Sequence, residues 1–148
     1  MNVPTVVSFP VSEVERLKKY FSERQYPVGE CLFEQNDMPN GCFYILEGEV
    51  ATQYYDHDVS AHIELEYYGE GELVGAMSLV VDEPRAMTVR AIKAAKVLFL
   101  SSEQLDTLKN IDELAYQEFF KLFNTSLINR IKKSRPLNKH AALQTAKI

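Results

Sequence analysis

The distribution of apolar residues divides the chain into a strand-like middle and helix-like ends. Between Tyr26 and Leu100, short runs rich in Tyr, Val, Ile and Phe are separated by glycines, which is the pattern of short β-strands and turns. Four of these runs have the length of ordinary strands, namely 42–47, 50–55, 62–67 and 96–100. Residues 56–58 are expected to form a hairpin tip. The spacing predicts a mainly β domain, built as a sandwich, a jelly roll or a closed β-roll over 26–100.

Helical signals flank this β region. Residues 12–15 read Ser-Glu-Val-Glu, a capping box that predicts a short N-terminal helix over 12–23. A similar cap at 101–104 predicts a helix that ends near Asn110, and Asp112 is placed to cap a longer one. We expect these two C-terminal helices to occupy 102–133. Pro136 should stop or kink the last helix, because proline lacks the amide donor.

The last helix carries more apolar surface than one packing contact needs. One set of apolar residues recurs at helical spacing, and a second set widens it. The first set is Tyr116, Phe120, Phe123, Leu127 and Ile131, and the second is Ala115, Phe119, Leu122 and Ile128. We expect one side of the helix to cover the β-roll and the other to form a homodimer or bind a protein partner.

Composition supports one domain over 1–136, followed by a basic tail over 137–148. The chain has 148 residues, of which 46% are hydrophobic, enough for a continuous core. No apolar run approaches the roughly 20 residues that span a bilayer, and the N-terminus lacks a secretory signal, so a cytoplasmic, non-membrane protein is expected. The two cysteines are expected to be reduced thiols. All acidic residues lie at or before Glu118; we expect the basic C-terminus to offset the helix dipole rather than to bind nucleic acid.

Residues 74–89 form the candidate site. A glycine followed by a short turn of helix exposes backbone N–H groups that can hold an anion, and an arginine from the next strand can clamp it. Gly75 and Arg85 fit these roles. On this pattern alone, Arg85 could equally be a surface ion-pair partner of Asp82 or Glu83.

Residues 10–133 resemble the cyclic nucleotide-binding domain of the CRP/FNR and kinase regulatory-subunit superfamily. The resemblance is carried by Tyr-Pro-Val-Gly-Glu-Cys-Leu-Phe at 26–33, Phe-Tyr-Ile-Leu-Glu-Gly-Glu-Val at 43–50, the glycines of 69–75 and the long last helix. The family's phosphate-binding cassette corresponds to 74–79 and 85–89. The resemblance implies a β-roll without a cofactor, with cAMP or another cyclic nucleotide as ligand. It implies binding by Gly75, Ala76, Met77, Ser78, Arg85, Ala86 and Met87.

The cassette departs from the family pattern at Ala76, which stands where the family has the glutamate that accepts a hydrogen bond from the ribose 2′-hydroxyl. Glu72 or Glu83 is a candidate replacement. Met87 replaces a small residue and either narrows the pocket or fills core space. Ala86 lacks the hydroxyl that family members favouring cGMP often use to bind guanine, so the resemblance implies a preference for cAMP over cGMP. Caps for the base are expected from Phe123, Leu127 and Ile131, which could instead be helix core or dimer seam.

Two main functions follow from these residues. The first is a regulatory module that binds a cyclic nucleotide or a related phosphorylated ligand through Arg85 and the cassette amides, and that signals through the last helix. The alternative is a degenerate fold without a nucleotide ligand, acting in dimerisation or protein interaction.

An enzyme is not expected. His57, His62, Glu64 and Glu66 could line a cupin metal site, but the His-x-His pair of cupins is missing and no metal is predicted. The residues after Pro136 are too few for a helix-turn-helix domain, so specific DNA binding in cis is not expected either.

Overall fold

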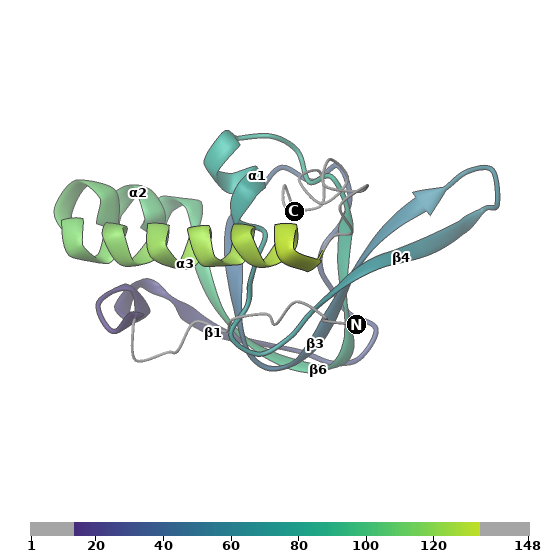
Figure 1. Ribbon diagram of the computed structural model, residues 1–148, viewed down its shortest axis with the longest axis horizontal. Coiled ribbons are helices and arrows are strands. Elements are labelled where there is room, and N and C mark those ends of the chain that lie inside the picture. Colours follow the sequence, from purple (N-terminus) through teal and green to yellow (C-terminus); the bar gives the residue numbers. More distant parts are fainter. Residues whose placement is uncertain (1–13, 134–148) are drawn as a thin grey trace.

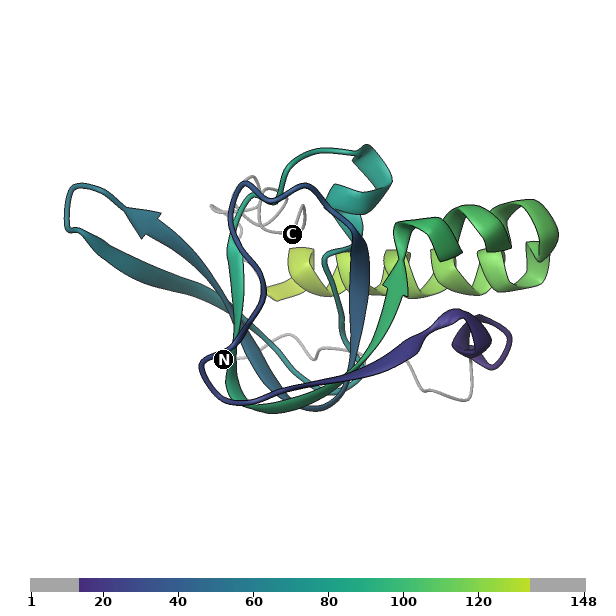
Figure 2. The same ribbon diagram turned by 180° about the vertical axis from the view of Figure 1, so that it is seen from behind.

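The computed structural model describes residues 14–133, which form an antiparallel β-roll with helices at one end. The elements, in chain order, are η2 (Leu17–Tyr20), β1 (Ser22–Tyr26), β2 (Cys31–Phe33), β3 (Gly41–Asp56), β4 (Ala61–Tyr68), β5 (Leu73–Val74), α1 (Ala76–Val81), β6 (Thr88–Ser101), α2 (Ser102–Ile111) and α3 (Glu113–Lys133). The strands pair in the order β1-β6-β3-β4, with β2 on β6 and β5 on β3. In both views, α2 lies beside the first part of α3 at one end, α3 runs on from there across the roll, and the β3–β4 hairpin projects from the other end (Figures 1 and 2).

The two long strands β3 and β6 form the frame of the roll. β3 continues through Gly48, so the two strands expected at 42–47 and 50–55 are one bent strand, with shifts in its register against β6 between Ile45 and Val50. Gly48 has φ 91°, and a Cβ there would lie 2.7 Å from Ala95 Cα. Glycine therefore allows a sharp bend with close backbone approach instead of ending the strand.

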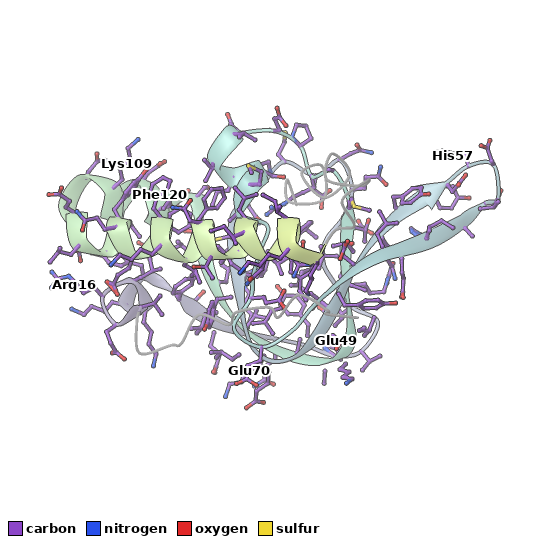
Figure 3. The ribbon with its side chains drawn as sticks, in the orientation of Figure 1. Arg16, Glu49, His57, Glu70, Lys109 and Phe120 are labelled. Carbon is purple, nitrogen blue, oxygen red and sulfur yellow. The ribbon has the colours of Figure 1, made fainter. Side chains whose placement is uncertain are left out.

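The predicted hairpin is present, but its turn covers residues 57–60, whereas the tip was expected at 56–58. β3 and β4 pair from Val50–Tyr68 to Asp56–Ala61, which leaves a turn after Asp56. His57 lies at the tip of this hairpin (Figure 3).

Two hydrophobic clusters hold the molecule together. One fills the inside of the roll and includes Phe33, Phe43 and Phe99. The other joins the sheet to the helices and includes Leu98 and Phe119. The cassette lies where these clusters meet, because Val74 belongs to the first and Ala76 to the second.

The N-terminal segment differs from the expected helix over 12–23. The described part is 3-10 helical at Val14 and over Leu17–Tyr20, and residues 22–26 form β1, paired with 95–99 of β6. The helical end predicted at Glu23 is therefore wrong. Strand pairing with β6 outweighs the local helical preference, which is a weak influence against tertiary context. The predicted start at Ser12 lies outside the described residues.

Both predicted caps of the C-terminal helices are confirmed. Ser101 Oγ accepts a hydrogen bond from the Gln104 amide at 3.1 Å, and Asp112 Oδ1 accepts one from the Ala115 amide at 3.1 Å. Asp112 also accepts a hydrogen bond from Tyr20 Oη at 3.0 Å, which ties η2 to the start of α3. The amide hydrogen bond and the contacts with Tyr20 and Arg16 hold the pKa of the Asp112 carboxyl below its ordinary value.

The apolar side chains of α3 divide differently from the expected pattern. The buried stripe comes from the second set, with Ala115, Phe119 and Leu122, whereas Phe120 and Phe123 of the first set are only partly buried. Ile128 is half exposed. Pro136 and the basic tail lie outside the described residues. Within 14–133, no helix is both long and apolar enough to cross a membrane.

Candidate functional site

The cassette consists of β5, a left-handed turn at Gly75, the short helix α1 and the segment that leads into β6. Gly75 has φ 88°, a conformation that glycine adopts without strain. A Cβ at Gly75 would lie 2.8 Å from Arg85 Nη1 and 3.2 Å from Phe33 Cε1. Glycine is thus required for the turn and for the close approach of the arginine.

Arg85 is buried behind this turn, with only 1% of its surface exposed. Its guanidinium donates hydrogen bonds from Nη1 to the Gly75 carbonyl at 2.6 Å and from Nη2 to the Gly41 carbonyl at 2.5 Å. The guanidinium carbon lies 3.9 Å from the centre of the Phe33 ring. Because the side chain is buried, the alternative of a surface ion pair with Asp82 or Glu83 is wrong.

The charge of Arg85 has little compensation. Arg85 Nε is buried and has no hydrogen-bond partner in the part of the chain that the structure describes. Burial lowers the pKa of Arg85 to about 10, so the guanidinium remains charged at neutral pH. Within the described residues, its hydrogen bonds go to two carbonyl groups and its guanidinium stacks on an aromatic ring, while the nearby Asp37 favours the charged form. A buried charge with an unpartnered donor is costly unless a further group compensates it.

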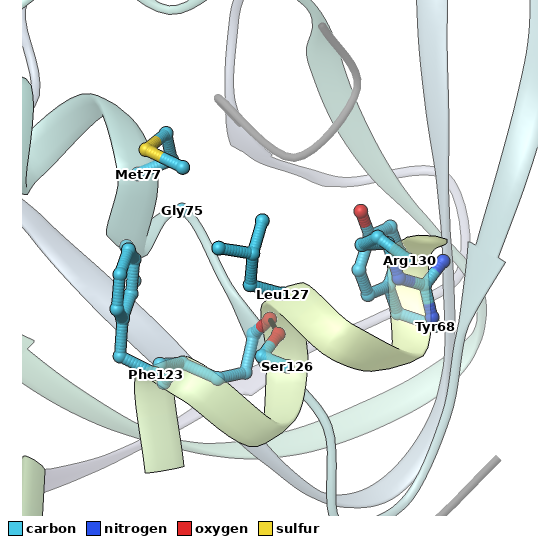
Figure 4. A pocket seen from close by; sticks show the side chains of 9 residues that line it. Tyr68, Gly75, Met77, Phe123, Ser126, Leu127 and Arg130 are labelled. Atoms are coloured by element: carbon cyan, nitrogen blue, oxygen red, sulfur yellow. Dashed lines mark hydrogen bonds between the residues drawn. The ribbon is translucent and has the colours of Figure 1, made fainter. Parts of the chain in front are cut away.

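A pocket separates the cassette from α3 and is shown in Figure 4. It is lined by Tyr68, Leu73, Gly75, Ala76, Met77, Phe123, Ser126, Leu127 and Arg130. Its volume is about 10 Å³, which is space for about one water molecule. The helix therefore covers the cassette closely.

The structure brings together some of the residues expected at the site and separates others. Gly75, Ala76, Met77, Phe123 and Leu127 line this one pocket. Ser78 is buried within α1, Ala86 is exposed, Met87 belongs to the cluster inside the roll, and Ile131 is half-buried outside the lining.

Polar contacts fix the end of α3 over the pocket. Ser126 Oγ donates a hydrogen bond to the Leu73 carbonyl at 2.8 Å. Arg130 pairs with Glu72, and its guanidinium carbon lies 3.8 Å from the centre of the Tyr68 ring. Lys133 Nζ lies 3.3 Å from Glu72 Oε1. Glu72, one of two candidate replacements for the missing family glutamate, forms ion pairs with Arg130 and Lys133 of α3.

Sequence reasoning did not find Arg130, Ser126 or Tyr68. Ser126, Arg130 and Lys133 are spaced four and three residues apart, which places them on one face of a helix. That polar face within an apolar helix was the available signal. The basic residues were instead assigned to the helix dipole.

The histidines of the cupin alternative lie far from this pocket, on the projecting hairpin. Tyr55 packs between them, with ring centres 4.8 Å from His57 and 5.3 Å from His62. Within the described residues, no group of three His, Cys, Asp or Glu side chains could hold a metal ion.

Comparison with known proteins identifies a family and several relatives. A family model described as "Cyclic nucleotide-binding domain" matches residues 23–112. The cAMP-dependent protein kinase type II regulatory subunit of Drosophila melanogaster is 28% identical, over 78% of this chain and 33% of its own. The chain spans about a third to a half of the length of such curated relatives.

Solved structures have the same fold. A cyclic nucleotide-binding domain from Methylobacillus flagellatus has a TM-score of 0.71 at 23% identity, covering 93% of this chain and 78% of that one. The c-di-GMP responsive global regulator CLP of Xanthomonas campestris has a TM-score of 0.72 at 20% identity, covering 89% and 65%. The family match extends over more than half of the chain, from β1 to the start of α3. The chain belongs to the cyclic nucleotide-binding domain family, whose members are regulatory.

Proposed function

We propose that this chain binds a cyclic nucleotide or a related phosphorylated small ligand at Arg85 and the backbone amides of α1, and that α3 transmits the bound state. The observation that carries the proposal is the buried, charged guanidinium of Arg85 with its unpartnered Nε. Isolated buried charge is costly unless an opposite charge or further hydrogen bonds compensate it. A phosphate would supply both, through the forked donor geometry of arginine.

The ligand class is narrowed by Ala76, which supplies no acceptor to a ribose hydroxyl. A hydrogen bond to a charged group contributes about 1.5–3 kcal/mol, or roughly 10- to 150-fold in affinity. We therefore expect weak binding of cAMP. The probes are cAMP and c-di-GMP, because one similar protein is a subunit of a cAMP-dependent kinase and another is a c-di-GMP responsive regulator.

Ligand binding would be transmitted to α3 because the pocket beneath this helix is too small for a nucleotide. A space of about 10 Å³ holds no nucleotide, so a ligand would enter only when α3 moves from the cassette. A ligand shifts such an equilibrium only by its differential affinity for the two states. The ligand would accordingly favour a conformation in which Phe123 and Leu127 no longer close the pocket.

The second candidate function is a degenerate module that acts through dimerisation or a protein partner. It is favoured by the closed pocket and by the internal hydrogen bonds of Arg85 to Gly75 and Gly41. Under this reading Arg85 is a structural residue alone.

Thermal unfolding and calorimetric titration with millimolar cAMP, cGMP and c-di-GMP separate the two functions. A ligand present at 100 times its Kd stabilises the folded state by about 2.7 kcal/mol. Arg85→Lys keeps the charge but loses the fork, and we expect it to reduce affinity at least tenfold. Arg24→Lys is the matched control, because Arg24 also stacks on a phenylalanine, Phe99, but lies on the outer strand β1. The absence of any stabilisation of the wild-type chain by all three nucleotides would refute nucleotide binding.

A further inference from the structure

The last two turns of α3 place two cations against the loop between β4 and β5. Arg130 has only 3% of its surface exposed, and Glu72 has 9%. Besides its pair with Glu72, Arg130 Nη1 lies 3.7 Å from Glu66 Oε2 and donates a hydrogen bond of 3.4 Å to the Tyr67 carbonyl. Such burial is uncommon for arginine and requires the partners that surround it.

Lys133 extends the same cluster by one helical turn. Its Nζ donates hydrogen bonds to the Tyr67 carbonyl at 3.1 Å and to Glu72 Oε1 at 3.3 Å. Burial lowers the pKa of Lys133, and the nearby Arg130 charge lowers it further. Glu72 therefore receives two cations from α3, one at each carboxylate oxygen.

The guanidinium of Arg130 also lines the pocket between the cassette and α3. Its carbon lies 3.8 Å from the centre of the Tyr68 ring, and both residues line the cavity together with Gly75 and Ala76 (Figure 4). An aromatic face that a planar base could use for stacking is thus already covered by a planar cation. The chain fills its own pocket with a side chain of α3.

We propose that the Arg130–Glu72 ion pair is a latch that holds α3 closed over the cassette, and that it competes with the ligand for the pocket. The competition rests on the proposed ligand site at Gly75 and Arg85, whereas the latch itself does not. When only a fraction of molecules is open, the apparent Kd equals the intrinsic Kd divided by that fraction. The strength of the latch thereby sets the ligand affinity of the whole domain.

Hydrogen exchange of the ligand-free chain tests the latch. Glu72→Gln removes the charge that Arg130 and Lys133 share, and we expect amides of residues 122–133 to exchange at least tenfold faster. Lys132→Gln is the matched control, since Lys132 is an exposed cation on the same turn, and it should leave exchange unchanged. Amides of β6 report whether the roll remains folded. Unchanged exchange of 122–133 in Glu72→Gln, with β6 protected, would overturn the latch.

Titration of the same variants with cAMP and c-di-GMP tests the competition. If α3 opens in Glu72→Gln, we expect at least one nucleotide to bind about tenfold more tightly than to the wild type. Equal affinity in the two proteins would overturn the competition. If α3 opens but neither nucleotide binds to any variant, the latch is supported and the proposed function is not. A failure of the latch can therefore be distinguished from a failure of the proposed function.

Discussion

Restoring the family carboxylate by Ala76→Glu tests both the closed pocket and its ligand. Ala76 is 5% exposed and packs in the cluster that joins the sheet to α3. Glutamate carries a carboxyl group and one more methylene than alanine, and they would lie beside a cavity with room for about one water molecule. The glutamate therefore fits only when α3 moves away from the cassette.

The cost has two sources. Overpacking of a close-packed region costs typically about 1–3 kcal/mol. Burial of the new carboxylate without a full set of hydrogen-bond partners adds to this cost. The cation Arg130 is already paired with Glu72, so the new carboxylate would have to share it. We therefore expect the variant to lose about 2–4 kcal/mol of unfolding free energy when no ligand is present.

Urea unfolding of the wild type, Ala76→Glu and Ala76→Gln measures this cost. The glutamine variant has the same shape without the charge and separates overpacking from electrostatics. With cAMP present, the new carboxylate offers the acceptor for the 2′-hydroxyl, and affinity should rise by about 10- to 150-fold. An Ala76→Glu protein as stable as the wild type, with α3 still protected from exchange, would refute the closed pocket.

Two further predictions concern the frame of the domain. Gly48→Ala places a Cβ against the Ala94 carbonyl and Ala95 at a residue with φ 91°. We therefore expect the free energy of unfolding, measured by chemical denaturation, to fall by at least about 2 kcal/mol. A variant as stable as the wild type would contradict the bend at Gly48. The pKa of Asp112 is lower in the folded state than in the unfolded state. The ionised carboxyl therefore stabilises the folded protein at pH values above its unfolded pKa of about 3.9, and this stabilisation is lost as the pH falls through the folded-state pKa. Unfolding of Asp112→Asn, measured from pH 7 to pH 2, should therefore depend less on pH over that acid range, and an unchanged profile would refute the role of this carboxyl.

Local signals in the sequence were enough for the helix starts of the C-terminal half. Ser101 and Asp112 cap α2 and α3 with their own side chains, and such caps depend only on neighbouring residues. The β-roll was predictable from glycine spacing and from the family resemblance. The bend at Gly48 was not, because a glycine between two apolar runs is equally typical of a turn and of a bulge.

The site was only partly predictable for a different reason. The turn at Gly75 follows from local sequence, and Gly75 lines one pocket together with Phe123 and Leu127, whose role as caps for a base stays a prediction. The partner of Arg130 lies 58 residues away along the chain. No periodicity in α3 identifies Glu72, since the pairing is fixed by how the helix docks on the β4–β5 loop.

The two carbonyls held by Arg85 belong to distant parts of the chain, and this links the cassette to the helices. Gly41 opens β3 and stands opposite Ser101, and the Ser102 amide donates a hydrogen bond to the neighbouring Asn40 carbonyl at 3.0 Å. Ser101 in turn caps α2. An anion that drew the guanidinium away from Gly41 would break one of the hydrogen bonds that hold the start of β3 next to the start of α2. Ligand binding in the cassette would therefore change the start of α2 as well as the end of α3.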